Sequence, residues 1–67
     1  MTDDELLSRP AAAALLGVHE GQIRRYERRG ELPVAETQML GRQRRVLYRR
    51  SDVEAIKIRR ERLRDGG

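Results

Sequence analysis

The sequence predicts a mainly α-helical fold in which three helices are combined with one small β-hairpin. Two short segments that end in glycine, at Gly17 and Gly30, follow one another near the N-terminus. A stretch of two-residue alternation around Gly41 comes next, and a Ser-Asp-Val-Glu sequence opens the last charged segment. Glycine commonly ends helices, alternation is typical of strands, and serine three residues before glutamate caps a helix start. Together these observations predict helix, helix, hairpin and helix.

The chain has 67 residues, which is enough for one domain, and we expect that domain to span 1–67 with frayed ends at 1–7 and 64–67. A domain this small buries proportionally little surface and is marginally stable. There is no cysteine, and the single histidine, His19, has no cluster of carboxylates near it in sequence. Without those ligands or a Gly-rich phosphate loop, we expect no metal, no cofactor and no enzymatic activity.

The N-terminus is acidic rather than basic, and no apolar run approaches the roughly 20 residues of a membrane span. We therefore expect no signal peptide and no membrane partner. The expected location is the cytoplasm of a bacterium or of a phage-infected host cell.

The first predicted helix begins after Ser8 and ends at Gly17. The serine hydroxyl can accept a hydrogen bond from the free amides of the first turn, where Pro10 is also tolerated. Alanine, the best helix former, dominates Ala11–Leu16. Val18 then enters the core across a short turn.

The second predicted helix begins at His19 or Glu20 and ends at Gly30. Ile23 and Tyr26 are three residues apart and can point together into a core. Spacings of three and four gather four arginines on another side: Arg24, Arg25, Arg28 and Arg29. A short helix with an apolar back and a cationic front suits the major groove of DNA. The alternative is an ordinary solvated surface helix.

Positive charge is carried almost entirely by arginine: the formal net charge is +4, and Lys57 is the only lysine beside 14 arginines. The planar guanidinium binds phosphate and guanine in a bidentate manner that an ammonium cannot reproduce. A GC-rich genome would also favour arginine codons. That alternative explains arginine over lysine but not the clustering of charge.

The segment from Val34 to Tyr48 predicts a β-hairpin, with strands near Glu36–Leu40 and Arg45–Tyr48. Its expected tip, residues 41–45, contains three arginines: Arg42, Arg44 and Arg45. A basic tip beside a basic helix can reach the DNA backbone or the narrow minor groove. A solubilising loop is the alternative.

The last predicted helix starts at a capping box, Ser51–Glu54, and runs to about Leu63. Val53, Ile56 and Leu63 fall roughly on one face, which we expect to join the core. Ile58 lies nearly opposite Ile56, so one of them is expected to be exposed.

This order of elements resembles the winged helix–turn–helix of the MerR superfamily. The likeness is greatest to its smallest branch, which includes phage excisionases (recombination directionality factors), AlpA-like and BldC-like regulators, and the DNA-binding domain of phage terminase small subunits. The matching residues cover nearly the whole chain: Leu7-Ser8, Ala12-Ala13, Leu16-Gly17-Val18, Ile23-Arg24-Arg25-Tyr26, Gly30-Glu31-Leu32-Pro33, Gly41, Tyr48 and Ser51-Asp52-Val53.

Two features depart from that family. Many members carry an arginine two positions before the wing tyrosine, whereas here Val46 holds that position and Arg45 precedes it. Full MerR activators continue into a long dimerisation helix and an effector domain, and only one short helix follows the hairpin here.

The resemblance implies which residues face DNA. Gly21, Gln22, Arg24 and Arg25 would lie on the recognition helix, Arg28 and Arg29 nearer the backbone, and Arg42, Arg44 and Arg45 in the wing. Arginine can read guanine and Gln22 can read adenine, and each good pair discriminates by roughly 1–3 kcal/mol.

The resemblance implies a DNA-binding protein of excisionase type, which would bind tandem sites cooperatively, bend double-stranded DNA and direct integrase toward excision. An acidic arm in one copy, Asp3-Asp4-Glu5, could meet the basic last helix of the next copy head to tail, at Arg59, Arg60 or Arg62. A BldC-like or AlpA-like transcription regulator and a terminase DNA-binding domain are alternatives. A module that binds an acidic protein partner is an alternative of another class.

Overall fold

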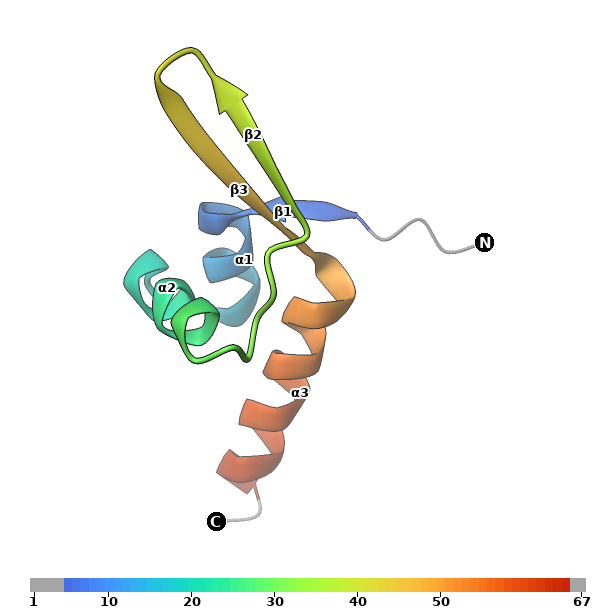
Figure 1. Cartoon of the computed structure of the whole chain (residues 1–67). Helices are drawn as coiled ribbons and strands as arrows, with labels where there is room; N and C mark the ends of the chain where they lie inside the picture. The colour runs from blue at the N-terminus through green and yellow to red at the C-terminus, as the bar shows by residue number, and fades with distance from the viewer. Residues whose placement is uncertain (1–4, 66–67) are drawn as a thin grey trace.

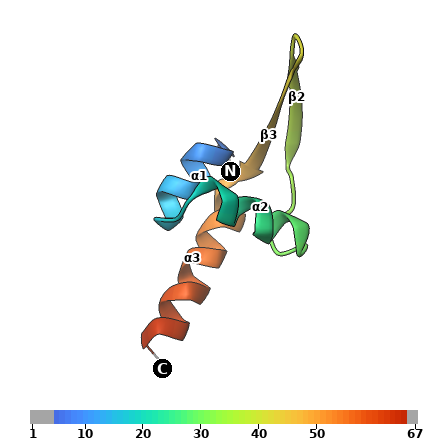
Figure 2. The same cartoon turned by 90° about the vertical axis from the view of Figure 1, so that its left-hand side faces the viewer.

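The computed structural model describes residues 5–65 and, within them, three helices and three strands (Figure 1). In chain order these are β1 (Leu6–Ser8), α1 (Arg9–Leu16), α2 (Glu20–Arg28), β2 (Glu36–Leu40), β3 (Gln43–Arg49) and α3 (Arg50–Asp65). The β2–β3 hairpin projects from one end of the molecule and α3 extends from the opposite end (Figure 2). The predicted fold class, a winged helix–turn–helix, is confirmed.

Helices α1 and α2 form the helix–turn–helix, and both end at the predicted glycines. The Oγ atom of Ser8 caps α1 by accepting a hydrogen bond from the Ala11 amide at 3.3 Å. The chain leaves α1 through Gly17, at φ 70°, and α2 through Gly30, at φ 81°, a left-handed conformation that glycine adopts readily. After each glycine, the next amide donates to a carbonyl five residues earlier at 2.9 Å, which satisfies a free helix-end carbonyl.

The three strands form one antiparallel sheet with β3 in the middle, in the order β1-β3-β2. The hairpin register places Glu36 opposite Leu47 and Leu40 opposite Gln43, so the turn between the strands is only residues 41–42. Gly41 is the first of these two residues and has φ 62°, as the first central residue of a type II′ turn does.

Strand β1 was not predicted, and it corrects the expectation that residues 1–7 are frayed. Leu6 pairs with Arg49 and Leu7 with Tyr48 along the free edge of β3. The first four residues of that expected frayed arm, 1–4, lie outside the described residues.

The core lies between the three helices and the base of the hairpin. Its buried side chains come from every element except β1 and β2: Ala12, Ala13, Ile23, Tyr26, Leu32, Val46, Tyr48, Val53 and Ile56. Val18 is partly buried against this cluster, as predicted for the turn residue.

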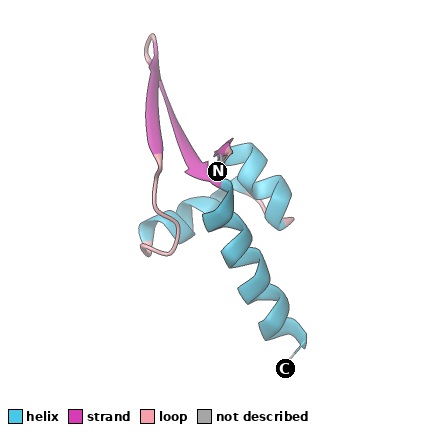
Figure 3. Cartoon of the chain, turned by 90° about the vertical axis from the view of Figure 1, so that its right-hand side faces the viewer, coloured by secondary structure: helices cyan, strands magenta, loops and turns pink. Residues whose placement is uncertain are grey.

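Helix α3 begins at Arg50, one residue before the predicted capping serine, and the Arg50 amide donates to the Glu5 carbonyl at 2.8 Å. Ile58 is 53% exposed, which answers the question of which isoleucine faces solvent. The prediction that Leu63 continues the buried face is wrong, because α3 extends past the core there and leaves this side chain 72% exposed (Figure 3). The helix runs to Asp65, so part of the end that was expected to fray is helical, and residues 66–67 lie outside the described residues.

Candidate nucleic-acid interface

The outward face of α2 carries arginine side chains, as the spacing predicts. Ile23 and Tyr26 on the inward face are 0% and 7% exposed, whereas Arg24, Arg25 and Arg28 are exposed. One turn of an α-helix takes 3.6 residues, so these arginines lie away from the core on adjoining lines of the helix. A helix whose inward face packs against the core in this way can present its charged face to a groove of DNA.

The fourth predicted arginine of α2, Arg29, is placed differently. It is the C-cap residue, beyond the last helical residue Arg28. Its guanidinium lies 3.8 Å from the carboxylate of Glu31, which also accepts a 3.2 Å hydrogen bond from Arg59. Arg29 is therefore partly neutralised at the end of the helix.

The first turn of α2 holds the two uncharged residues of the predicted site, Gly21 and Gln22. With Arg25 they line a shallow hollow of about 600 Å³, to which α3 contributes Arg60. No heavy atom outside α2 lies within 4 Å of the place where a Gly21 side chain would begin, so this surface is open to close approach. Arg60, which the sequence did not single out on this surface, donates a 2.7 Å hydrogen bond to the Tyr26 hydroxyl.

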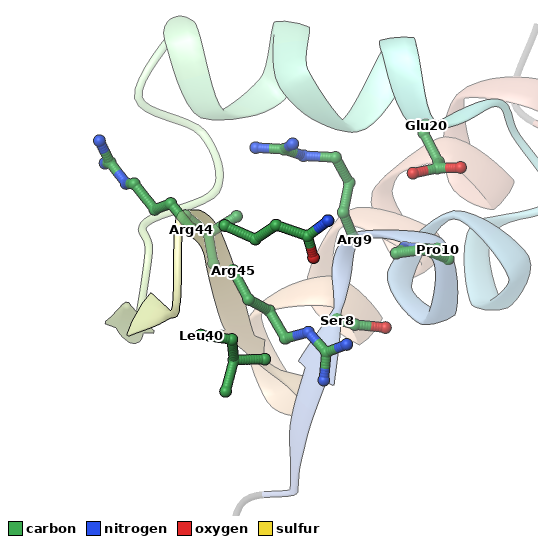
Figure 4. A pocket seen from close by; sticks show the side chains of 9 residues that line it. Ser8, Arg9, Pro10, Glu20, Leu40, Arg44 and Arg45 are labelled. Carbon is green, nitrogen blue, oxygen red and sulfur yellow. The ribbon is translucent and has the colours of Figure 1, made fainter. Parts of the chain in front are cut away.

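The wing places its arginines in a way that corrects the predicted tip. Only Arg42 lies in the turn, because strand β3 begins at Gln43 and includes both Arg44 and Arg45. Neighbouring strand residues point to opposite faces. Arg44 accordingly shares a face with the buried Val46 and lies toward α2, whereas Arg45 turns toward Ser8 (Figure 4).

Ion pairs within the chain involve some of the described arginines and not others. Four of them pair with a carboxylate of this chain: Arg9, Arg29, Arg50 and Arg59. By contrast, no acidic side chain that the structure describes pairs with most of the predicted DNA-facing set: Arg24, Arg25, Arg28, Arg42, Arg44 and Arg45. Six unneutralised guanidinium groups are therefore available on α2 and the wing for an anionic partner.

A small polar network connects the wing to α2 behind this surface. Glu27 accepts a 2.6 Å hydrogen bond from the Tyr48 hydroxyl and a 3.5 Å bond from Arg9, both at its Oε1 atom. Burial raises the pKa of the Tyr48 hydroxyl, and the hydrogen bond to Glu27 raises it further. Burial alone would lower the pKa of Arg9, but its interactions with Tyr48 and Glu27 outweigh that effect and raise it.

The sequence analysis missed this network, in which Glu27 pairs with Arg9, 18 residues away on α1. Glu27 lies four residues after the buried Ile23 and next to the buried Tyr26, which places a carboxylate at the edge of the core-facing side of α2. A charged residue at such a position needs a partner when the helix packs. That spacing was the available signal, although it does not reveal that the partners come from α1 and β3.

The described residues contain no group of three histidine, aspartate or glutamate side chains arranged to hold a metal ion. Within the same part of the chain, none of the helices combines the length and the apolar composition that crossing a membrane requires.

The fold and this surface define a winged helix–turn–helix: two helices joined by a tight turn, with a hairpin beside the second one. The chain belongs to the helix–turn–helix domain family, whose pattern matches residues 6–63. Searches of curated proteins and of solved structures gave no significant match. Helix–turn–helix domains place their second helix in the major groove, so membership of this family indicates DNA as the partner.

Proposed function

We propose that this protein binds double-stranded DNA sequence-specifically, with α2 in the major groove and the wing against the neighbouring backbone or minor groove. The observation that carries the proposal is the set of six arginines on α2 and the wing that have no carboxylate partner among the described side chains. An arginine loses contacts with water when it meets an anion. The charge-assisted hydrogen bonds that it forms with the anion replace those contacts. Elsewhere among the described side chains, Arg9, Arg50 and Arg59 pair with carboxylates of this chain, whereas Arg49, Arg60 and Arg62 do not.

In this proposal the recognition residues are those on the outward face and first turn of α2. Arg24 or Arg25 would read a guanine, and Gln22 would read an adenine, because these side chains match the donors and acceptors of those bases. Arg28 and the wing arginines would contact phosphates, which strengthens binding without reading sequence. The partly neutralised Arg29 would contribute less than the others.

We further propose that the biological role is of excisionase type, within the small branch of the MerR superfamily. The family of small helix–turn–helix proteins to which the chain belongs is one of excisionase-like and AlpA-like members. The segment between α2 and β2 supports a winged arrangement of this kind. Leu32 is fully buried, and the Ala35 amide donates to the Leu47 carbonyl at 2.8 Å. These contacts hold the wing close to α2. The protein would act by binding and not by catalysis.

One copy covers too little DNA for this role, since single modules bury roughly 600–1,000 Å². Several copies on tandem sites would bend the DNA and let integrase assemble its excisive complex. The head-to-tail contact proposed for such an array has fewer free partners than the sequence indicates, because Glu5 pairs with Arg50, Arg59 with Glu31 and Arg60 with the Tyr26 hydroxyl. Arg62 is the remaining candidate on α3, and Asp3 and Asp4 lie outside the described residues.

The test is a footprint on the DNA that flanks the gene, with integrase absent in one lane and present in the next. The proposal predicts protected direct repeats and an integrase footprint that extends when the protein is present. Protection of a promoter without an effect on integrase would indicate a transcription regulator of the AlpA-like or BldC-like kind. No protection, together with capture of an acidic protein after nuclease treatment, would contradict DNA binding itself.

Cooperative assembly is tested separately, by gel shifts on duplexes that carry one, two or three tandem copies of the protected sequence. Cooperation predicts that affinity per site rises with the number of copies. Equal affinity per site would rule out an array held together by protein contacts.

A further inference from the structure

A groove between the start of α1 and the wing has no role in the surface described so far. It has a volume of about 280 Å³ and lies between Ser8, Arg9 and Pro10 on one side and the strand residues 43–46 on the other (Figure 4). We call it the α1–wing groove. Three arginines line it, namely Arg9, Arg44 and Arg45, against one carboxylate, Glu20 at the first position of α2.

Arg9 is the residue that makes this groove unusual. Its side chain is 24% exposed and lies beneath α2, beside the strand that leads from the wing (Figure 4). Its Nε atom is buried and has no hydrogen-bond acceptor among the described residues. Buried N–H groups nearly always have a partner, so this one indicates a contact that the free chain does not complete.

The ion pair between Arg9 and Glu27 is long. The Nη2 atom of Arg9 lies 3.5 Å from Glu27 Oε1, at the limit of hydrogen-bond geometry, and that oxygen already accepts the 2.6 Å bond from Tyr48. A guanidinium has five donors in a planar fork and favours an anion with several acceptor oxygens. Because Arg9 lines the groove, donors of this fork that Glu27 does not engage are available to an anion there.

The shape of DNA shows which anion would meet the groove. In B-DNA the major and minor grooves are separated by a sugar–phosphate strand, so a protein with α2 in one groove and the wing in the next must straddle that strand. The α1–wing groove opens between these two elements, with Arg44 on the α2 side and Arg45 on the Ser8 side (Figure 4). The straddled backbone would therefore run along it.

We propose that the α1–wing groove binds a backbone phosphate of the straddled DNA strand, and that Arg9 is the residue that binds it. This inference rests on the proposed DNA-binding function and adds a third contacting element, the start of α1, to α2 and the wing. Glu20 sets a limit on the site, because its carboxylate repels a phosphate that approaches this end of the groove. The Tyr48–Glu27 bond joins the wing to α2 beside this groove.

The experiment uses the full chain and a labelled duplex that the wild-type protein selects from a random library. Arg9→Gln is compared with wild type by ethylation interference and by the salt dependence of affinity. Lys57→Gln, which removes one charge from an exposed position on α3, is the matched control. We expect Arg9→Gln to lose interference at one phosphate, to lower the slope of log affinity against log salt by about 0.9, and to weaken binding about fivefold near 0.15 M salt. The control should keep the wild-type interference pattern.

A second variant keeps the test decisive if Arg9→Gln does not fold, as judged by circular dichroism. Glu20→Gln changes an exposed residue and removes the repelling carboxylate, so it should tighten binding and strengthen interference at the same phosphate. Unchanged interference in both variants, with wild type still bound, overturns the groove as a phosphate site and leaves the proposed function standing. Failure of wild type to bind any selected duplex overturns both.

Discussion

The hydroxyl of Tyr48, at the end of the wing strand β3, donates a 2.6 Å hydrogen bond to Glu27 on α2, the second helix of the helix–turn–helix. The two residues are 21 positions apart, and Tyr48 is fully buried. This bond joins the two elements that must keep a fixed relation if one is to enter a groove while the other contacts the backbone. Its strength should be visible both in stability and in pH dependence.

Replacing Tyr48 with phenylalanine should lower the free energy of unfolding by about 1.5–3 kcal/mol, the usual contribution of a hydrogen bond to a charged group. The ring still fills its place in the core, so the loss reports the hydroxyl. Urea unfolding followed by circular dichroism measures it. A change below about 0.5 kcal/mol would mean that the bond contributes little to holding the wing against α2.

The raised pKa of Tyr48 also predicts a loss of stability in alkali. In the unfolded chain the phenol ionises near its ordinary pKa of about 10, while in the folded protein it keeps its proton to higher pH. Above about pH 10 the unfolded state therefore binds fewer protons, and the free energy of unfolding falls as pH rises through the folded pKa. Below that range the contribution is fully present.

The measurement is the urea midpoint at about pH 8 and about pH 10.5 for wild type and Tyr48→Phe. Wild type should lose more stability between these values than the variant, because the variant has no phenol at this position. Equal losses in the two proteins would show that Tyr48 titrates at its ordinary pKa.

Two isoleucines on α3 provide a matched pair for the core. Ile56 is 4% exposed and Ile58 is 53% exposed, although they are two residues apart on one helix. Ile56→Ala should cost about 2–5 kcal/mol, and Ile58→Ala should stay within about 0.5 kcal/mol. Leu63→Ala should behave like Ile58→Ala. A large cost at Leu63 in the isolated monomer would contradict the exposed end of α3.

Ile23→Ala tests whether the back of α2 is held as the structure places it. The side chain is fully buried in the core, so its truncation should again cost about 2–5 kcal/mol. That is a large share of the stability of so small a domain, and the variant should be partly unfolded near 37 °C. Thermal unfolding followed by circular dichroism checks this. If the variant melts like wild type, the packing of α2 against the core is not as described.

The local features of the fold could be predicted because neighbouring residues determine them. The Ser8 cap and the turns at Gly17, Gly30 and Gly41 each need a residue type at one position, and the structure confirms all four. The inward direction of Ile23 and the outward direction of the α2 arginines follow from helix geometry in the same way.

The features that were missed depend on residues far apart in the chain. Strand β1 exists because Leu6 and Leu7 find the free edge of β3 some forty residues later, and three residues carry too little pattern to predict a strand. The wing arginines were placed in a five-residue tip because alternation does not fix where a hairpin turns. The two-residue turn at Gly41 moves Arg44 and Arg45 into β3, on opposite faces.

The core end of α3 and the place of Glu27 were missed for a related reason. Periodicity puts Leu63 on the same face as Ile56 but does not say where the partner surface stops. Sequence likewise does not reveal that Arg9 from α1 and Tyr48 from β3 meet at one carboxylate. These are packing results, which the order of residues alone leaves open.

The central claim is that α2 reads bases while the wing contacts the backbone. Comparing Arg25→Ala and Arg44→Ala on the selected duplex and on single-base variants of it tests this most directly, with affinities measured across a range of salt. Arg25→Ala should weaken the selected sequence and relax preference at one base pair, by about 1–3 kcal/mol of discrimination. Arg44→Ala should weaken all sequences alike and lower the salt slope by about 0.9. If both variants keep the wild-type footprint, preference and salt slope, α2 and the wing are not the DNA-binding surface.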